Sequence, residues 1–318
     1  MRPAAVCRID HVNVLSKDPE ATAAVLAEVL GLPVSAPQVG CPTFELIILA
    51  AGNMTLESTR QRGGPQPGDG IALTGIVFEP ATTAAASSAQ LQDRGVPHLA
   101  PLAFAGPHTR PSTYGPFRRA TDGPNWRVFP VDGVLSEGTP VVSRASARAL
   151  VAGAPMSGAM GSAMGRVASG RRLGRMSAGL FALPPEYLAI CEWGHDVPAR
   201  RAADAQRFAE TQAAGPGLTG VREVVVTASD LDAARQRWQG LLDPAIGTGD
   251  RWVLDDGPAL VLEAGNRDGL ARLVFGATSI PATSAWLAER ALLGAGSTDT
   301  ELRIEPARVG GLDLRITG

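Results

Sequence analysis

His11 is the first residue in the chain whose side chain could carry chemistry. It lies in the apolar run IDHVNVL, seven residues before Asp18. A histidine there is either a core side chain with a hydrogen-bond partner or a metal ligand, since neutral imidazole binds metals well. Strand alternation would put His11 and Asn13 on one face and Val12 and Val14 on the other. We therefore expect a polar face toward a cleft and an apolar face toward helices.

Two glutamates at the ends of strand-like runs are further candidates. Glu57 closes GNMTLES, and Glu192 closes YLAICEW, where alternation groups it with Ile190 and Leu188. A carboxylate among apolar neighbours is costly unless it is paired or bound to a metal. The structural alternative for both residues is a solvated strand end.

Four other residues could serve a site near these strands. His195 follows Glu192 by three positions and is a loop histidine, a substitute ligand or a general base. Arg127 could grip an anionic substrate, although a charged sheet surface explains it equally simply. Tyr114 and Trp126 could wall a pocket or pack in the core.

A repeated pattern indicates which elements position these residues. Glu223 precedes Asp230 by seven residues, as His11 precedes Asp18, and each aspartate begins a helix-like segment. Both aspartates are suited to cap a helix N-terminus. The later strand run GPALVLEA closes on Glu263 as GNMTLES closes on Glu57. A repeat of this length indicates duplication at the level of domains.

Weaker copies complete a chain of four strand–helix–strand modules. Each copy reads as a strand, a helix and further strands, which predicts an α+β fold of four modules. The predicted domains are 1–198 (modules 5–62 and 70–195), a linker at 199–217 with a polar helix, and 218–318. The stretch 134–180 lacks sustained periodicity and is interpreted as a flexible insertion or a lid.

Composition excludes several classes of partner. The net charge of −2 gives no reason to expect nucleic acid or an anionic membrane. The sequence contains no run of about 18 strongly apolar residues, and its N-terminus lacks the apolar core of a secretory signal. Three cysteines without a CxxC pair indicate neither a disulfide framework nor a cysteine zinc site. Cytoplasmic location is expected, and the near-exclusive use of arginine over lysine is typical of GC-rich bacterial genomes.

At the sequence level the chain resembles the vicinal oxygen chelate superfamily, which includes glyoxalase I, extradiol dioxygenases, fosfomycin-resistance enzymes and bleomycin-binding proteins. The segments that carry the resemblance are IDHVNVLSKDPEATAAVLAEVLGLPV, TFELIILAAGNMTLES and EYLAICEWGHD. The resemblance implies that four βαβββ modules pair to form two half-closed, curved mixed sheets, each around a cleft and with helices outside. It is more specific for fold than for reaction, because one scaffold hosts many chemistries.

The resemblance also implies a metal site. The superfamily places ligands on the first and last strands of paired modules, and these positions match His11, Glu57 and Glu192, while the fourth falls near Gly75. Such a set suits Mn²⁺, Fe²⁺, Ni²⁺, Co²⁺ or Zn²⁺. The open coordination positions would take a small oxygenated substrate, with Glu192 or His195 as the base and Asn13, Arg127, Trp126 and Tyr114 around it.

The second half lacks histidine, and its matching positions are Glu223, Glu263, Arg272 and Arg315. They predict buried ion pairs and a degenerate, structural copy. That counts against ring cleavage, because two-domain extradiol dioxygenases hold their iron in the C-terminal half. The leading hypothesis is a metal-dependent isomerase or lyase acting beside a carbonyl. The alternatives are a metal-free binding or antibiotic-sequestering protein and an Fe(II) dioxygenase. Monomer and homodimer are both compatible.

Overall fold

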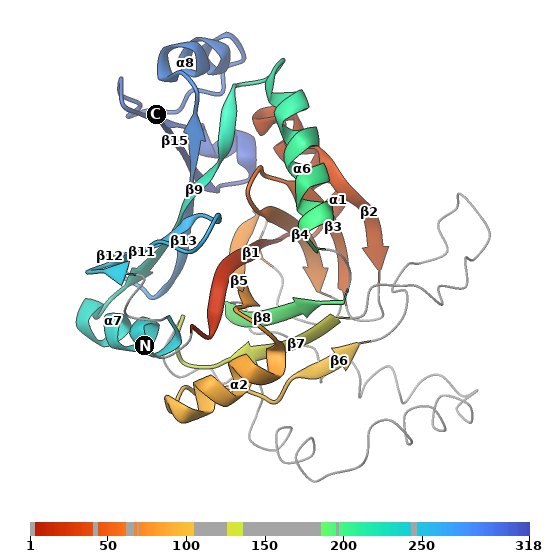
Figure 1. Cartoon of the computed structure of the whole chain (residues 1–318). Coiled ribbons are helices and arrows are strands. Elements are labelled where there is room, and N and C mark those ends of the chain that lie inside the picture. Colours follow the sequence, from red (N-terminus) through yellow and green to blue (C-terminus); the bar gives the residue numbers. More distant parts are fainter. Residues whose placement is uncertain are drawn as a thin grey trace, which may run out of the picture.

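The structure is a computed structural model. It describes residues 4–40, 44–61, 67–68, 70–104, 126–135, 186–194, 197–242 and 247–318. These residues form two mixed β-sheets with helices on the outside (Figure 1). The predicted α+β fold class is therefore confirmed. Most of the stretch 134–180 lies outside the described residues, and the division into domains stays a prediction.

The first module matches the expected βαβββ order. Its elements are β1 (Val6–Leu15), α1 (Pro19–Leu30), β2 (Val34–Gly40), β3 (Phe44–Ala50) and β4 (Thr55–Gln61). Asp18 caps α1 as predicted, because its carboxylate accepts hydrogen bonds from the backbone N–H groups of Glu20 and Ala21. Gly31 ends the helix in the left-handed conformation, with φ of 65°.

The second module repeats this order and continues the same sheet. It comprises β5 (Ala72–Pro80), α2 (Ala84–Asp93), β6 (Leu102–Phe104), β7 (Trp126–Val131) and β8 (Tyr187–Trp193). The strand order is β2-β3-β4-β1-β5-β8-β7-β6. β1 and β5 are antiparallel at the centre, and each runs parallel to the last strand of its own module.

The C-terminal modules build a second sheet of the same design. They comprise β9 (Leu218–Ala228), α7 (Leu231–Leu241), β10 (Gly247–Thr248), β11 (Arg251–Trp252), β12 (Ala259–Ala264), β13 (Gly269–Ala277), α8 (Ile280–Glu289), β14 (Glu301–Arg303), the short 3₁₀ helix η1 (Pro306–Val309) and β15 (Asp313–Thr317). The strand order is β10-β11-β12-β9-β13-β15-β14. Asp230 caps α7, as predicted.

The helix predicted within 199–217 is α6 (Val197–Gln212), which contacts β3 of the first sheet and β9 of the second. Figure 1 shows α6 over the first sheet and beside β9. The side chain of Gln212 fixes its end. It donates to the carbonyl oxygens of Leu30 and Gly31 and accepts from the backbone N–H of Leu218.

The two faces of the first sheet differ in chemistry. One face, here called the helix face, packs into the main apolar core through residues such as Val12, Leu56, Ile76 and Ile190. The opposite face, here called the His11 face, carries His11, Asn13, Glu57, Tyr187 and Cys191. This arrangement confirms the polar and apolar alternation predicted around His11. None of the described helices is both long and apolar enough to cross a membrane.

Candidate functional site

His11 lies between two carboxylates on the His11 face. It is 6% exposed, its Nδ1 lies 2.7 Å from Asp10 Oδ2, and its Nε2 lies 3.4 Å from Glu57 Oε2. The distance to Asp10 is that of a charge-assisted hydrogen bond, which fixes the orientation of the ring. The structure thus brings His11 and Glu57 together, as the sequence predicted, and adds Asp10.

A β-bulge brings Asp10 beside its neighbour. In a regular strand, adjacent side chains point to opposite faces. Here Ile9 pairs with Phe78 and His11 pairs with Val77, so Asp10 is the extra residue of β1 and has no partner on β5. Because a bulge redirects side chains locally, the carboxylate and the imidazole of consecutive residues can meet.

Asp10 is in turn held by one residue of β8 and one residue of α6. The indole N–H of Trp193 donates to its Oδ2 at 3.0 Å, and the guanidinium of Arg200 lies 3.7 Å from its Oδ1. Arg200 also stacks over the Trp193 ring, 4.8 Å from its centroid. α6 and β8 together therefore position the carboxylate that orients His11.

Asp10, His11 and Glu57 change one another's pKa values. Burial alone would raise the pKa of Asp10, but the hydrogen bond and charge of His11, with Arg200 and Trp193, lower it to about 2. Burial opposes protonation of His11, whereas the charges of Glu57 and Asp10 raise its pKa on balance. Burial raises the pKa of Glu57. The two neighbouring carboxylates therefore favour the protonated form of His11.

Asn13 and Tyr187 complete the surroundings. The Asn13 side-chain Nδ2 is buried and has no hydrogen-bond partner among the described residues. Gly75, which pairs with Asn13, lies under the Tyr187 ring, and a Cβ there would come within 2.7 Å of Tyr187 Cε1. The position that the resemblance left without a ligand is therefore filled by an aromatic ring.

Glu192 does not join His11 and Glu57. It lies on the helix face, as its alternation with Ile190 and Leu188 implies, whereas His11 lies on the opposite face. Its Oε2 accepts the backbone N–H of Ala84 at the start of α2, at 2.7 Å. Its Oε1 forms a 3.0 Å ion pair with Arg127. The carboxylate offsets the cost of its position by capping a helix and pairing with a cation.

The remaining sequence candidates fall into two groups. Arg127 lies opposite Glu192 in register, so it too belongs to the helix face, with a half-exposed side chain. Trp126 begins β7 opposite Trp193. Tyr114 and His195 lie outside the described residues. Only Asn13 of the proposed substrate-binding residues is placed beside His11 and Glu57.

The predicted three-ligand metal site does not fit the described residues. His11 Nε2 and Glu57 Oε2 are close enough to share one ion, and a carboxylate behind Nδ1 is common for metal-binding histidines. Glu192, however, lies on the opposite face of the sheet. Across the described parts of the chain, no three His, Cys, Asp or Glu side chains are grouped to hold a metal. Two donors are fewer than the three that protein sites with open positions provide.

The matching region of the second sheet contains ion pairs. Glu263 pairs with Arg272, Glu223 with Arg251, and Arg315 with Asp313 and Glu301. Ion pairs were predicted here, but they are partly exposed rather than buried: the Glu263 side chain is 39% exposed. The strand register also differs from the sequence match. Glu57 lies opposite Asn13, two residues after His11, whereas Glu263 lies opposite Thr227, four residues after Glu223.

Sequence reasoning missed Asp10, Trp193, Arg200 and Tyr187. The one available signal was the adjacent pair Asp10-His11, which strand alternation sends to opposite faces unless a bulge intervenes. The signals for the other three residues lie in the pairing of β5 with β8 and in the path of α6.

Solved structures of other proteins have a similar architecture. The chain shares its fold with an extradiol ring-cleaving dioxygenase. A variant of homoprotocatechuate 2,3-dioxygenase from Brevibacterium fuscum has a TM-score of 0.53 and 14% identity, covering 99% of this chain and 72% of that one. A hypothetical protein from Staphylococcus aureus has a TM-score of 0.54 and 9% identity, covering 98% of both chains.

These similarities concern the fold alone, because identities this low do not carry site residues or chemistry across. A further variant of the Brevibacterium dioxygenase, solved in complex with HPCA, shares 15% identity and a TM-score of 0.53 over 99% of this chain and 72% of that one. At the sequence level, no protein-family model and no curated protein matches the chain.

Proposed function

We propose that the His11 face binds a small oxygenated organic molecule and transfers protons beside its carbonyl, with Glu57 and His11 as the acid–base pair. The observation that carries this proposal is the buried chain from Asp10 through His11 to Glu57. Groups whose environments shift their pKa values in this way are concentrated at sites that move protons.

The roles follow from the charges. Burial raises the pKa of Glu57, which suits a base, and the charges of Glu57 and Asp10 favour the protonated form of His11, which suits an acid. Glu57 would take a proton from the carbon next to the carbonyl. The electron pair of that C–H bond would form the C=C bond of an enol, and His11 would donate its proton to the oxygen. Reversal at a neighbouring carbon gives an isomerisation.

The surroundings of Asn13 also support the proposed proton transfer. Its side-chain amide is buried on the His11 face with Nδ2 unpartnered within the described part of the chain. A buried N–H without a partner costs about 1–3 kcal/mol. A substrate carbonyl would supply the missing acceptor, and the N–H would stabilise the negative charge that develops on that oxygen. Asp10 holds the ring of His11 in position throughout.

The test is hydrogen exchange in D₂O on a panel of small carbonyl compounds such as dihydroxyacetone and pyruvate, followed by proton NMR. We expect the protein to accelerate loss of the signal next to one carbonyl, and Glu57→Gln and His11→Gln to abolish that acceleration. Binding of a compound without exchange of its protons would indicate a sequestering protein instead.

Metal analysis of the same samples gives an independent check. Stoichiometric metal in the parent protein that is lost in His11→Ala would overturn the acid–base proposal in favour of a metal site. Activity that survives thorough chelation would support the proposal.

A further inference from the structure

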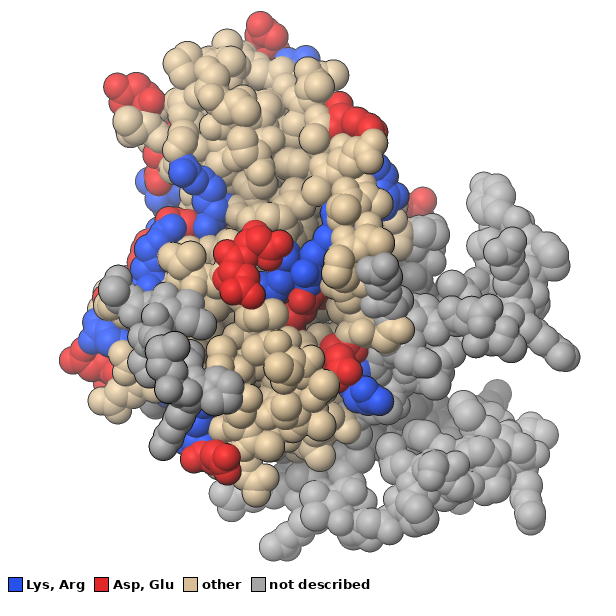
Figure 2. All heavy atoms as spheres, viewed as in Figure 1, with Lys and Arg blue, Asp and Glu red and all other residues tan. Residues whose placement is uncertain are grey.

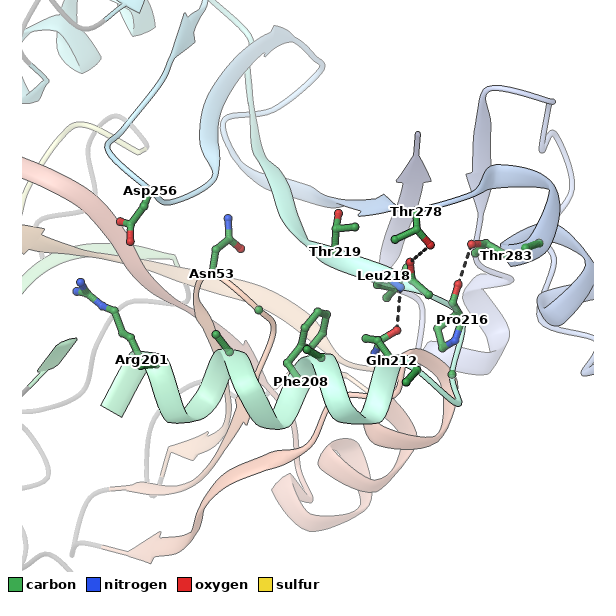
Figure 3. A pocket seen from close by; sticks show the side chains of 18 of the residues that line it. Asn53, Arg201, Phe208, Gln212, Pro216, Leu218, Thr219, Asp256, Thr278 and Thr283 are labelled. Carbon is green, nitrogen blue, oxygen red and sulfur yellow. Dashed lines mark hydrogen bonds between the residues drawn. The ribbon is translucent and has the colours of Figure 1, made fainter. Parts of the chain in front are cut away.

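A long groove lies between α6 and the C-terminal half, away from the residues of the His11 site. Its volume is 1330 Å³, and neither His11 nor Glu57 lines it. Figure 3 shows α6 along one side and the chain from Pro216 to Thr219, with Thr278 and Thr283, on the other. Clefts between packed halves of a chain are frequent ligand sites.

The side of the groove formed by α6 is almost free of charge beyond its first turns. Phe208 and four alanines lie at helical spacing along it: Ala202, Ala205, Ala209 and Ala213. Trp286 and Leu218 contribute apolar surface from the C-terminal half. A helix face of small residues leaves room for a bound molecule, and the aromatic rings give it apolar surface to pack on.

Both sides of the groove are held firmly. Asn53 forms two hydrogen bonds to the backbone of Val221, at 2.9 and 3.0 Å, as a strand partner would. Gly52 and Gly220 approach so closely that a Cβ on Gly52 would lie 2.8 Å from Gly220 Cα. Gln212 ties the end of α6 to α1 and β9. A preformed groove loses little conformational entropy when it binds a ligand.

The charged side chains of the groove are at one end. Arg8 and Arg201 both line the groove, and Arg8 pairs with Asp256. Figure 3 shows Arg201 and Asp256 at the same end. The Arg8 side chain is only 3% exposed, and its Nε has no partner among the described residues. Burial and the charge of Arg8 lower the pKa of Arg201, which means that the two guanidinium groups repel each other. A further anion at this end would relieve that repulsion.

The present partners of these arginines leave room for such an anion. Arg8 pairs with Asp256, whose side chain is 74% exposed, and Arg201 pairs with Glu79. Because the Asp256 carboxylate is largely exposed to solvent, a carboxylate of the ligand can take its place beside Arg8. Figure 2 shows acidic and basic side chains meeting near the middle of this face, with mostly uncharged surface above them.

The length of the groove limits the ligand. Arg201 and Gln212 both line the groove on α6 and lie eleven residues apart, which is about 16 Å along a helix. One end is cationic and the remainder is largely apolar. We propose that this groove binds a single-chain carboxylate amphiphile, with its carboxylate at Arg8 and Arg201 and its alkyl chain along Phe208 toward Trp286.

The test is a calorimetric titration of the full chain with dodecanoate below its micelle concentration, beside dodecanol, dodecylamine and acetate. We expect saturable binding of dodecanoate, binding at least tenfold weaker for dodecanol and dodecylamine, and none for acetate. Arg201→Gln should weaken dodecanoate about tenfold and leave dodecanol unchanged.

A variant that fills the groove separates this site from general adsorption. Ala209→Trp places a large ring in the groove and should abolish binding. Ala203→Trp puts the same ring on an exposed part of α6 that does not line the groove, and it should bind like the parent. Binding that is not saturable, that survives Ala209→Trp or that is equally strong for dodecylamine would overturn the proposal. None of these results depends on the chemistry at His11.

Discussion

The two sheets share one topology but differ at the centre of their inner strand pairs. Asn13 and Val225 each lie five residues before the aspartate that caps the next helix. Asn13 pairs with Glu57 on the parallel strand, whereas Val225 pairs with Val261. The same fold therefore forms around a buried polar group in one half and around apolar side chains in the other.

The two halves also differ in the neighbouring strand, which is β5 in the first half and β13 in the second. Asn13 lies opposite Gly75, and Val225 lies opposite Arg272, which pairs with Glu263. In the first half a glycine makes room for the ring of Tyr187. In the second half a long cation fills the matching place and reaches a carboxylate that is 39% exposed. The comparison shows that the fold forms without the buried charges of the first half, which supports the acid–base role proposed for them.

Replacing one glutamate by glutamine in each half should give the largest difference between the two halves, measured as the rate of proton exchange. Glu57→Gln should lower the rate of the proton exchange described above by about 10²–10⁴-fold, the usual contribution of a positioned acid or base. Glu263 is the glutamate that the sequence pattern matches to Glu57 in the second half, and Glu263→Gln should leave that rate unchanged. Equal losses in the two variants would contradict the assignment of the chemistry to the first half. Circular dichroism of both variants shows whether the fold is kept.

A methyl group at Gly75 should destabilise the protein without removing any polar group. The added Cβ of Gly75→Ala would clash with Tyr187, and overpacking of this kind costs about 1–3 kcal/mol. Denaturant unfolding measures the loss. Gly68→Ala is the control, because a Cβ at Gly68 meets no atom within 4 Å. If Gly75→Ala proved as stable as the control, the ring of Tyr187 would not fill this position.

Asp10 should make stability depend on pH at the acidic end. Its pKa is about 2 in the folded protein against 3.8 as the ordinary value, a difference equivalent to about 2 kcal/mol. Because the folded pKa is the lower one, this stabilisation is present above pH 4 and is lost as the pH falls toward 2. Asp10→Asn should be less stable at pH 7 and should show a flatter pH dependence between pH 4 and 2. Urea unfolding at a series of pH values measures both effects, and unchanged curves would contradict them.

The smallest effect is expected at Glu192. Glu192→Ala removes the carboxylate that caps α2 and pairs with Arg127, which should cost about 1 kcal/mol. Proton exchange at the His11 site should stay within twofold of the parent. A loss as large as that of Glu57→Gln would show that Glu192 belongs to the site after all, through a different arrangement of β8.

Local patterns predicted most of the fold. Asp18 and Asp230 marked helix starts correctly because N-caps depend on a few consecutive residues. The repeated spacing in the two halves predicted the modules, and the family resemblance added their pairing into two mixed sheets. Alternation around His11 separated the polar face from the apolar face, since a strand buried on one side imposes a period of two.

The candidate site was predicted only in part, because its remaining members depend on pairing between distant strands. His11 and Glu57 meet as expected, but Glu192 was assigned to the site although its own alternation with Ile190 placed it on the helix face. Tyr187 reaches the site through the pairing of β8 with β5, and Arg200 through the position of α6. No short segment of sequence reports such distances.

The bulge at Asp10 makes the number of residues in β1 as important as their identity. Deleting one residue between Ile9 and His11 would restore a regular ladder with β5 and would leave the imidazole without the carboxylate that orients it. Loss of the Asp10 codon would therefore remove the bulge and the carboxylate in one step, whereas a substitution of Asp10 removes the carboxylate and keeps the extra residue. Among relatives of this chain, a gap in an alignment at that point would mark the gain or loss of the oriented histidine.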